Sequence, residues 1–135
     1  MQDVRTLSKE DQELIQIACA HAKKRFKKDF MSVGGALRTK SGKIYTGINL
    51  KYKVRTISIC AEPIAIHTAL NEGESEFDTV VGVKYIEESD SFEVLNSCGN
   101  CRQLYNYIAP LKVIIDNKGK LEVVDAESLL PFSFI

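Results

Sequence analysis

The chain has 135 residues, 44% of them apolar, and its 18 basic and 18 acidic residues give a formal charge of zero at neutral pH. A chain of this length and apolar content can bury a core of its own, so we expect a single domain over residues 1–135. The zero net charge disfavours a nucleic-acid partner, which usually requires an excess of basic residues, and favours a small substrate.

The N-terminal residues, MQDVRTLSKEDQEL, lack the basic and then apolar pattern of a secretion signal. No apolar stretch approaches the roughly 20 residues that a membrane-spanning helix needs. We therefore expect a cytoplasmic protein without a membrane partner. In that reducing compartment, four cysteines favour metal binding, catalysis or simple packing over disulfides. The basic run at residues 23–29 is most simply the solvated end of a helix, with an anion-binding patch as the alternative.

The first half of the chain predicts a helix, a hairpin and a second helix. Residues 8–27 place apolar side chains at helical spacing behind a capping residue, Ser8. Residues 34–50 hold two strand-like runs around a Ser-Gly turn signal, which predicts a β-hairpin. Residues 60–72 show helical spacing again, and Gly73 ends that helix.

The second half alternates strands with helices. Residues 78–88 form a nearly continuous apolar strand, residues 98–109 a helix that stops before a proline, and residues 111–117 and 121–125 two further strands, followed by a short closing helix or turn. This order predicts a three-layer α/β/α fold with a central five-stranded mixed sheet. The helices at 60–72 and 98–109 are expected to cross between parallel strands.

Three cysteines lie at the starts of these two crossing helices. Cys60 begins the first, while Cys98 and Cys101 begin the second and share a face because they are three residues apart. Helix N-termini lower the pKa of thiols, and the starts of crossing helices meet at the carboxyl edge of a parallel sheet. Three converging thiolates select zinc and leave a fourth tetrahedral position open, as in catalytic zinc sites.

Glu62 lies beside this predicted zinc site without being a ligand, so it is the candidate group to accept a proton from zinc-activated water and deliver it elsewhere. Arg102, directly after the last cysteine, is the candidate cation that offsets the excess thiolate charge. Three structural alternatives remain open: a closed site that recruits Cys19, ligation by His67, and an ordinary first-turn role for Glu62.

The segments CAE at 60–62 and CGNCRQ at 98–103 resemble the signature of the zinc-dependent cytidine deaminase superfamily. The segments SVGGAL, SGKIYTGINL and SLLPFSF are similar to other parts of the same family, so the resemblance covers nearly the whole chain. Small members with this three-cysteine pattern include cytidine deaminase and blasticidin-S deaminase, both typically homotetramers. The resemblance therefore implies a cytidine-deaminase-like fold and a homotetramer.

The resemblance also implies an activity and its residues. A nucleoside, or a nucleoside-like compound such as blasticidin S, would lose the amino group of its cytosine ring as ammonia. One Zn²⁺ per subunit would be held by Cys60, Cys98 and Cys101, and Glu62 would carry protons to ring N3 and to the departing amine. The implied substrate contacts are the Ala61 amide, the Ser97 carbonyl, Asn49 at the ribose, Phe30, Val33 and Lys51 around it, and Phe134 reaching a neighbouring subunit. Ordinary packing of the tail is the alternative for Phe134.

Three residues depart from the family pattern. Lys51 stands where cytidine deaminases, but not blasticidin-S deaminase, usually carry a glutamate that grips the ribose, which suggests an altered nucleoside or one whose sugar carries a carboxylate. Pro63 replaces an arginine that shares the thiolate charge, so Arg102 would carry that role alone. Ser97 stands where a proline usually precedes the CxxC pair.

Two other functions are weighed against the enzyme. One is a non-catalytic, zinc-stabilised scaffold, for which Glu62 would be unnecessary. The other is a deaminase acting on RNA or DNA, which the zero net charge disfavours.

Overall fold

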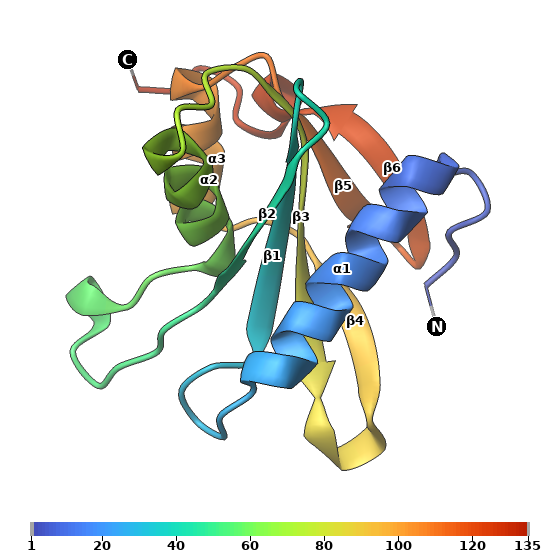
Figure 1. Cartoon of the computed structure of the whole chain (residues 1–135), viewed down its shortest axis with the longest axis vertical. Helices are drawn as coiled ribbons and strands as arrows, with labels where there is room; N and C mark the ends of the chain where they lie inside the picture. Colours follow the sequence, from blue (N-terminus) through green and yellow to red (C-terminus); the bar gives the residue numbers. More distant parts are fainter. Residues whose placement is uncertain (1, 135) are drawn as a thin grey trace.

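The computed structural model describes residues 2–134, within which three helices and six strands form three layers (Figure 1). The helices are α1 (Lys9–Arg25), α2 (Ala61–Asn71) and α3 (Gly99–Tyr107). The strands are β1 (Val33–Thr39), β2 (Ile44–Ile48), β3 (Phe77–Ile86), β4 (Ser91–Leu95), β5 (Lys112–Asn117) and β6 (Lys120–Asp125). Short 3-10 helices lie at Arg55–Ile57, Glu87–Ser89 and Ala126–Leu129. Among the helices of residues 2–134, none has the length and apolar character to cross a membrane.

The strands form one mixed sheet in the order β2-β1-β3-β5-β6, with β4 also paired to β3. β1 is antiparallel to both β2 and β3, and β3 is parallel to β5 through the pairs Thr79–Lys112 and Val80–Val113. β4 runs antiparallel to the second half of β3, from Gly82 to Ile86. The edge of β3 that faces away from β1 is therefore shared by β5 and β4, one at each end of the strand.

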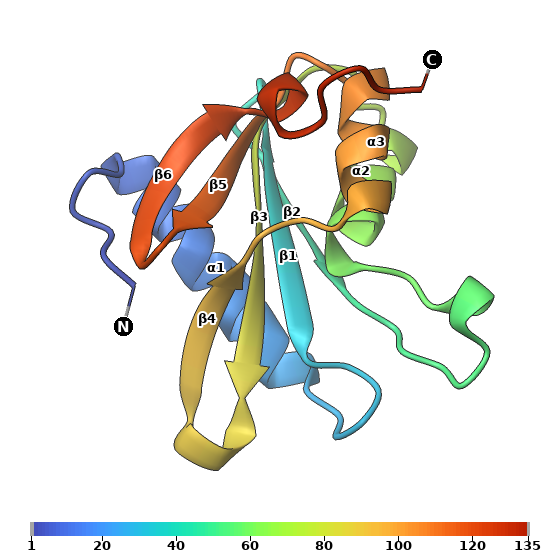
Figure 2. The same cartoon turned by 180° about the vertical axis from the view of Figure 1, so that it is seen from behind.

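Each face of the sheet has its own hydrophobic core. α1 covers one face, where Leu14 and Ala18 pack against Val81 and Val83 of β3. α2 and α3 cover the other face, where Ile66 and Tyr105 pack in one cluster with other core residues (Figure 2). Successive residues of β3 alternate between the two cores, because side chains along a strand point to opposite faces. This explains the continuous apolar run at residues 78–88.

The predicted three-layer α/β/α architecture is confirmed, and each predicted helix starts and ends within two residues of the observed one. Ser8 caps α1 as expected, since its side chain accepts a hydrogen bond from the amide of Asp11. The crossing through α3 joins the parallel neighbours β3 and β5. The crossing through α2 joins β2 and β3, which run parallel but are separated by β1.

The predicted count of five strands is wrong, because β4 was not recognised. Its five residues, SFEVL, hold only three apolar side chains and follow an acidic, serine-containing turn. Phe92 and Val94 nevertheless alternate toward the core under α1, which is the pattern of a strand buried on one face. Pairing with β3 stabilises a segment whose own composition is weakly β-forming.

Glycines in β1 and β2 let α2 lie directly on the sheet backbone. A Cβ atom at Gly47 would lie 2.5 Å from the carbonyl oxygen of Ala61 and 2.6 Å from the amide nitrogen of Ala65. A Cβ atom at Gly35 would lie 3.0 Å from the Ala61 backbone. The first turn of α2 is thereby held at a fixed depth above β1 and β2, together with the residues at its start.

We predict that Gly47→Ala destabilises the fold by about 2 kcal/mol, a fall of roughly 8 °C in Tm, because the new methyl group meets backbone atoms that cannot rotate away. Thermal unfolding followed by circular dichroism measures the change. Gly99→Ala is the matched control, since a Cβ there meets no atom within 4 Å. Equal Tm values for the two variants would contradict the close packing.

Candidate metal centre

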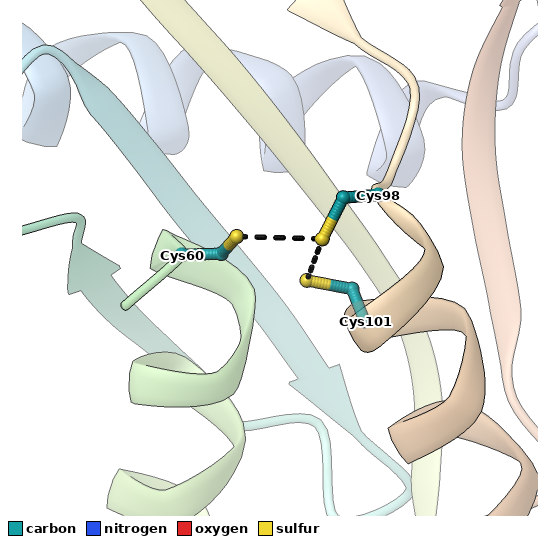
Figure 3. Close-up of side chains that lie close together, drawn as sticks. All are labelled: Cys60, Cys98 and Cys101. Atoms are coloured by element: carbon teal, nitrogen blue, oxygen red, sulfur yellow. Dashed lines mark hydrogen bonds between the residues drawn. The ribbon is translucent and has the colours of Figure 1, made fainter. Parts of the chain in front are cut away.

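Three thiols from the starts of two helices converge on one point (Figure 3). The Sγ atoms of Cys60 and Cys98 are 3.5 Å apart, and those of Cys98 and Cys101 are also 3.5 Å apart. All three sulfur atoms lie within 4.8 Å of one another. Residues 38 positions apart in the sequence are thus brought into contact by the sheet between them.

The helix caps explain this convergence. Cys60 and Cys98 are the N-cap residues of α2 and α3, and both have extended backbone angles, with φ near −70°. N-cap side chains commonly bond back to the helix amides, but neither thiol does so here. Both sulfur atoms are therefore free to point at each other, and Cys101, buried in the first turn of α3, completes the cluster.

The cluster fits zinc. A tetrahedral zinc ion with Zn–S bonds of about 2.3 Å places its sulfur ligands about 3.8 Å apart, close to the spacing of the thiols. Thiolates are the soft ligands that zinc prefers over magnesium or calcium. Cys60, Cys98 and Cys101 would hold the ion, and three protein ligands leave a fourth position for water or substrate. The predicted zinc site is confirmed as a cluster able to hold the metal.

The expectation that helix ends lower all three thiol pKa values holds for Cys98 alone. Burial acts to raise the pKa of Cys98, but the nearby backbone amides of Cys101 and Asn100, together with the neighbouring thiols, lower it. Burial raises the pKa of Cys60 to about 11, and burial with the charge of Glu62 raises the pKa of Cys101. Binding a cation at the cluster therefore has to release protons from Cys60 and Cys101.

The two alternative ligands lie elsewhere. Cys19 is in α1 and packs against the core on the opposite face of the sheet, where burial raises its pKa to about 11. His67 is exposed on α2, two turns from its start. Cys19 is only partly buried, so it packs against the core as expected but at its border, while the interpretation of His67 as an exposed residue agrees with its position.

Glu62 is a buried acid next to the thiols, with only 5% of its surface exposed. Burial raises the pKa of its carboxyl group, although a hydrogen bond from the Ser97 hydroxyl, 3.3 Å from Oε2, lowers it. On its other side, a Cβ at Gly82 would lie 2.9 Å from Oε2, so only glycine in β3 leaves room for the carboxyl group. A buried carboxyl whose pKa is raised is suited to exchanging protons near neutral pH.

A cavity of about 280 Å³ opens beside these groups. Its walls include Cys60, Ala61, Glu62 and Cys98 at one end and Val33, Asn49, Leu50, Lys51, Ser58, Ile59, Leu95 and Asn96 around it. The segment from residue 51 to 58 borders the cavity and is closed at its base, where the backbones of Leu50 and Ile59 exchange two hydrogen bonds of 2.9 Å. The volume suits a small ring compound.

Known proteins of similar sequence help to interpret this combination of thiol ligands, buried acid and cavity. Residues 8–116 match the family described as "Cytidine and deoxycytidylate deaminase zinc-binding region". The chain belongs to the zinc-dependent cytidine deaminase family. It is 35% identical over 132 residues to blasticidin-S deaminase of Bacillus cereus, which covers 95% of this chain and 94% of that protein.

Two cytidine deaminases are also similar to this chain. The enzyme from Sporosarcina psychrophila is 30% identical over 105 residues, which are 76% of this chain and 74% of the relative. The crystal structure of cytidine deaminase from Burkholderia pseudomallei has 31% sequence identity and a TM-score of 0.75, covering 91% of this chain and 98% of that one. The resemblance drawn from the CAE and CGNCRQ segments is thereby confirmed.

The substrate-binding residues expected of a cytidine deaminase divide into three groups. Val33, Asn49, Lys51 and Ala61 line the cavity. Ser97 is buried behind Glu62. Phe30 and Phe134 lie at the surface, 45% and 80% exposed, and the carbonyl of Phe134 accepts a hydrogen bond from Gln103 of α3.

The Asn49 side chain supports the cavity wall. Its Oδ1 accepts hydrogen bonds from the amides of Ser32 at 2.9 Å and Val33 at 3.0 Å, which ties the entry of β1 to the end of β2. These contacts use the oxygen and leave the Nδ2 group to donate to a ligand. Lys51, two residues further along the chain, is exposed, and its amide donates to the carbonyl of Phe30.

Arg102 makes two hydrogen bonds to backbone carbonyls. Its Nε donates to Ser97 at 2.8 Å and its Nη1 to Leu129 at 3.1 Å. The guanidinium group thus connects the residues at the start of α3 with the C-terminal segment. It lies next to the thiol cluster whose charge it is predicted to neutralise. Its contribution to thiolate charge remains a prediction.

Two contributors to this cytidine deaminase site were missed from the sequence. Gly82 was assigned only to a strand, although its lack of a side chain makes room for Glu62. Tyr105 was assigned only to a helix, although its hydroxyl lies 2.7 Å from that of Ser97. The signal for Tyr105 was its spacing, since residues 98, 101 and 105 fall on one helical face.

We predict that Cys60→Ser, Cys98→Ser and Cys101→Ser each reduce bound zinc from about one ion per chain to a small fraction, because three thiolates supply the affinity. Inductively coupled plasma mass spectrometry on the purified proteins measures the metal. Cys19→Ser, on the other face of the sheet, should retain zinc. Zinc-free wild type, or zinc loss in Cys19→Ser, would contradict the assignment.

Proposed function

We propose that the protein catalyses hydrolytic deamination of the cytosine ring of a nucleoside or nucleoside-like compound, giving the uracil form and ammonia. The observation that carries the proposal is the buried Glu62 at the wall of the same cavity that the thiols border. A non-catalytic scaffold is not favoured, because it has no need of a desolvated acid in an open cavity. The relatives named as cytidine deaminase and blasticidin-S deaminase support the same reaction class.

Cys60, Cys98 and Cys101 would hold a zinc ion, which would supply the Lewis acidity that activates a water molecule. Glu62 accepts a proton from the attacking water and gives it to ring N3 as the new C–O bond forms at C4. Glu62 then passes the second proton of the water to the amino group, and the C4–N bond breaks to release ammonia. The raised pKa of Glu62 suits both directions of transfer, because a buried carboxyl accepts a proton more readily than an exposed one.

The cavity supplies contacts for the substrate. The Ala61 amide lies in the first turn of α2, where backbone N–H groups have no partner within the helix, and is proposed to bind the pyrimidine O2. The Ser97 carbonyl, already held by Arg102, keeps a second lone pair for the amino group. Asn49 would donate to the sugar through Nδ2, with Val33 at the wall and Phe30 near the rim.

Lys51 gives the sugar end of the cavity a positive charge. It has no salt bridge among the pairs found in residues 2–134, and neither do Lys53 and Arg55 in the adjoining segment. Unpaired cations beside a cavity attract an anionic ligand more than a neutral one. We therefore propose that the preferred substrate carries a negative group on its sugar, such as the carboxylate of a uronic-acid nucleoside.

We propose further that residues 1–135 act as one domain in a cytoplasmic homotetramer. The four free thiols fit a reducing compartment. The exposure of Phe134 leaves it available to reach a neighbouring subunit. Sedimentation velocity tests the assembly, and a monomer would remove the shared-site role of Phe134.

We predict that Glu62→Ala lowers kcat for cytosine deamination by at least about 10³-fold, because proton transfer loses its carrier. The loss of amino-pyrimidine absorbance measures the rate, and zinc is measured on the same sample. Glu62→Gln, which keeps the shape but cannot exchange protons, should behave alike. Gly82→Ala, which displaces the carboxyl group, should lose about tenfold. Activity of Glu62→Ala within about twofold of wild type would contradict the proton-carrier role of Glu62, whereas absence of deamination in the wild type would leave the scaffold as the better function.

We predict that Lys51→Glu lowers kcat/KM for blasticidin S or another uronic-acid nucleoside by about tenfold relative to cytidine, because attraction becomes repulsion. A panel of cytidine, deoxycytidine, cytosine and blasticidin S supplies the comparison. Lys40→Glu makes the same charge change in the hairpin turn at the other end of β1 and should leave the ratio unchanged. Wild-type preference for cytidine by a wide margin would refute the anionic substrate.

A further inference from the structure

Two hydroxyl groups stand in line behind Glu62. The Tyr105 hydroxyl lies 2.7 Å from the Ser97 hydroxyl, which lies 3.3 Å from Oε2 of Glu62. All three side chains are buried, with exposed fractions of 0% for Tyr105, 6% for Ser97 and 5% for Glu62. Glu62 lies in α2, Tyr105 in α3, and Ser97 two residues before α3, so the contact forms only when both helices are docked.

The chain of hydrogen bonds has one direction. Ser97 donates its single hydroxyl proton to Oε2 of Glu62, 3.3 Å away. The Ser97 oxygen must then accept from Tyr105, which becomes the first donor of the chain. Burial raises the pKa of Tyr105 well above its usual value, with the charge of Glu62 adding to the shift, so the phenol keeps its proton.

The position of the carboxyl group is restricted on both sides. Gly82 lies against Oε2 from the sheet, and Ser97, just before the N-cap of α3, holds the same oxygen. Glu62 also lines the cavity, and Ser97 is the side chain that donates to its carboxyl group. One oxygen is therefore held by protein while the other remains for proton exchange with the cavity.

We propose that Tyr105 and Ser97 are positioning residues for the deamination reaction, which fix the Glu62 carboxylate through a directed pair of hydrogen bonds. The inference rests on the proposed function. Hydrogen-bonded hydroxyls can also be present only to satisfy each other in a core, because a buried hydroxyl without a partner is costly. The two roles differ in what they change: a positioning role acts on turnover, and a packing role acts on stability.

Tyr105→Phe separates the two roles, because it removes one oxygen atom and keeps the ring that fills the core. We expect kcat to fall about fivefold to tenfold with KM within about twofold and zinc content unchanged, since the carboxylate loses its orientation but the substrate contacts remain. Tyr45→Phe is the control: it removes a tyrosine hydroxyl bonded to Glu74, away from the cavity, and should keep the wild-type kcat. All rates are measured well below the unfolding temperature of each variant.

A double-mutant cycle tests the order of the chain. Ser97→Ala, which keeps the backbone carbonyl, should lower kcat about tenfold, and adding Tyr105→Phe should cost less than a further twofold because the connection to Glu62 is already cut. A lowered Tm with wild-type kcat in Tyr105→Phe, or multiplicative losses in the double variant, would overturn the proposal. Absence of deamination in the wild type would instead overturn the proposed function itself.

Discussion

The close approach of α2 to the sheet is the constraint on which the site depends. Gly35 and Gly47 place no side chain between the strands and the first turn of the helix, so the helix backbone rests on the strand backbone. Cys60, Ala61 and Glu62 are consecutive at that turn, and fixing its depth fixes a ligand, an amide donor and an acid together. The positions of these three groups are therefore set by backbone contact, which is stiffer than contact between side chains.

Electrostatics then links the acid to the thiols. Glu62 and the cysteines all become negative on ionisation, and after burial the charge of Glu62 is one of the causes that raise the pKa values of Cys60 and Cys101. A divalent cation relieves this repulsion, which makes metal binding and the state of the carboxyl group parts of one equilibrium. The N-terminal amides of α2 and α3 add positive partial charge at the same place.

The metal ligands could be predicted from the sequence because their chemistry is local: Cys98 and Cys101 are three residues apart at a helix start, and Cys60 has Glu62 beside it. The three-layer fold followed from strands alternating with helices. β4 could not be predicted in the same way, because pairing with β3 outweighs its mixed composition. Gly82 and Ser97 contact Glu62 across 20 and 35 positions of sequence, and such contacts depend on how α2 and α3 dock against the sheet.

The segment from residue 51 to 58 borders the cavity where the substrate is proposed to bind, and it is closed at its base before the residues proposed to carry out the reaction begin. Leu50 and Ile59 pair with each other immediately before Cys60, so the segment between them leaves and rejoins the rest of the molecule at one point, with the Lys51–Phe30 backbone hydrogen bond as a further connection. Replacing that segment by another, in evolution or by engineering, can change which molecules enter the cavity. The reacting groups beneath it would keep their places, and one catalytic centre could serve compounds of very different size.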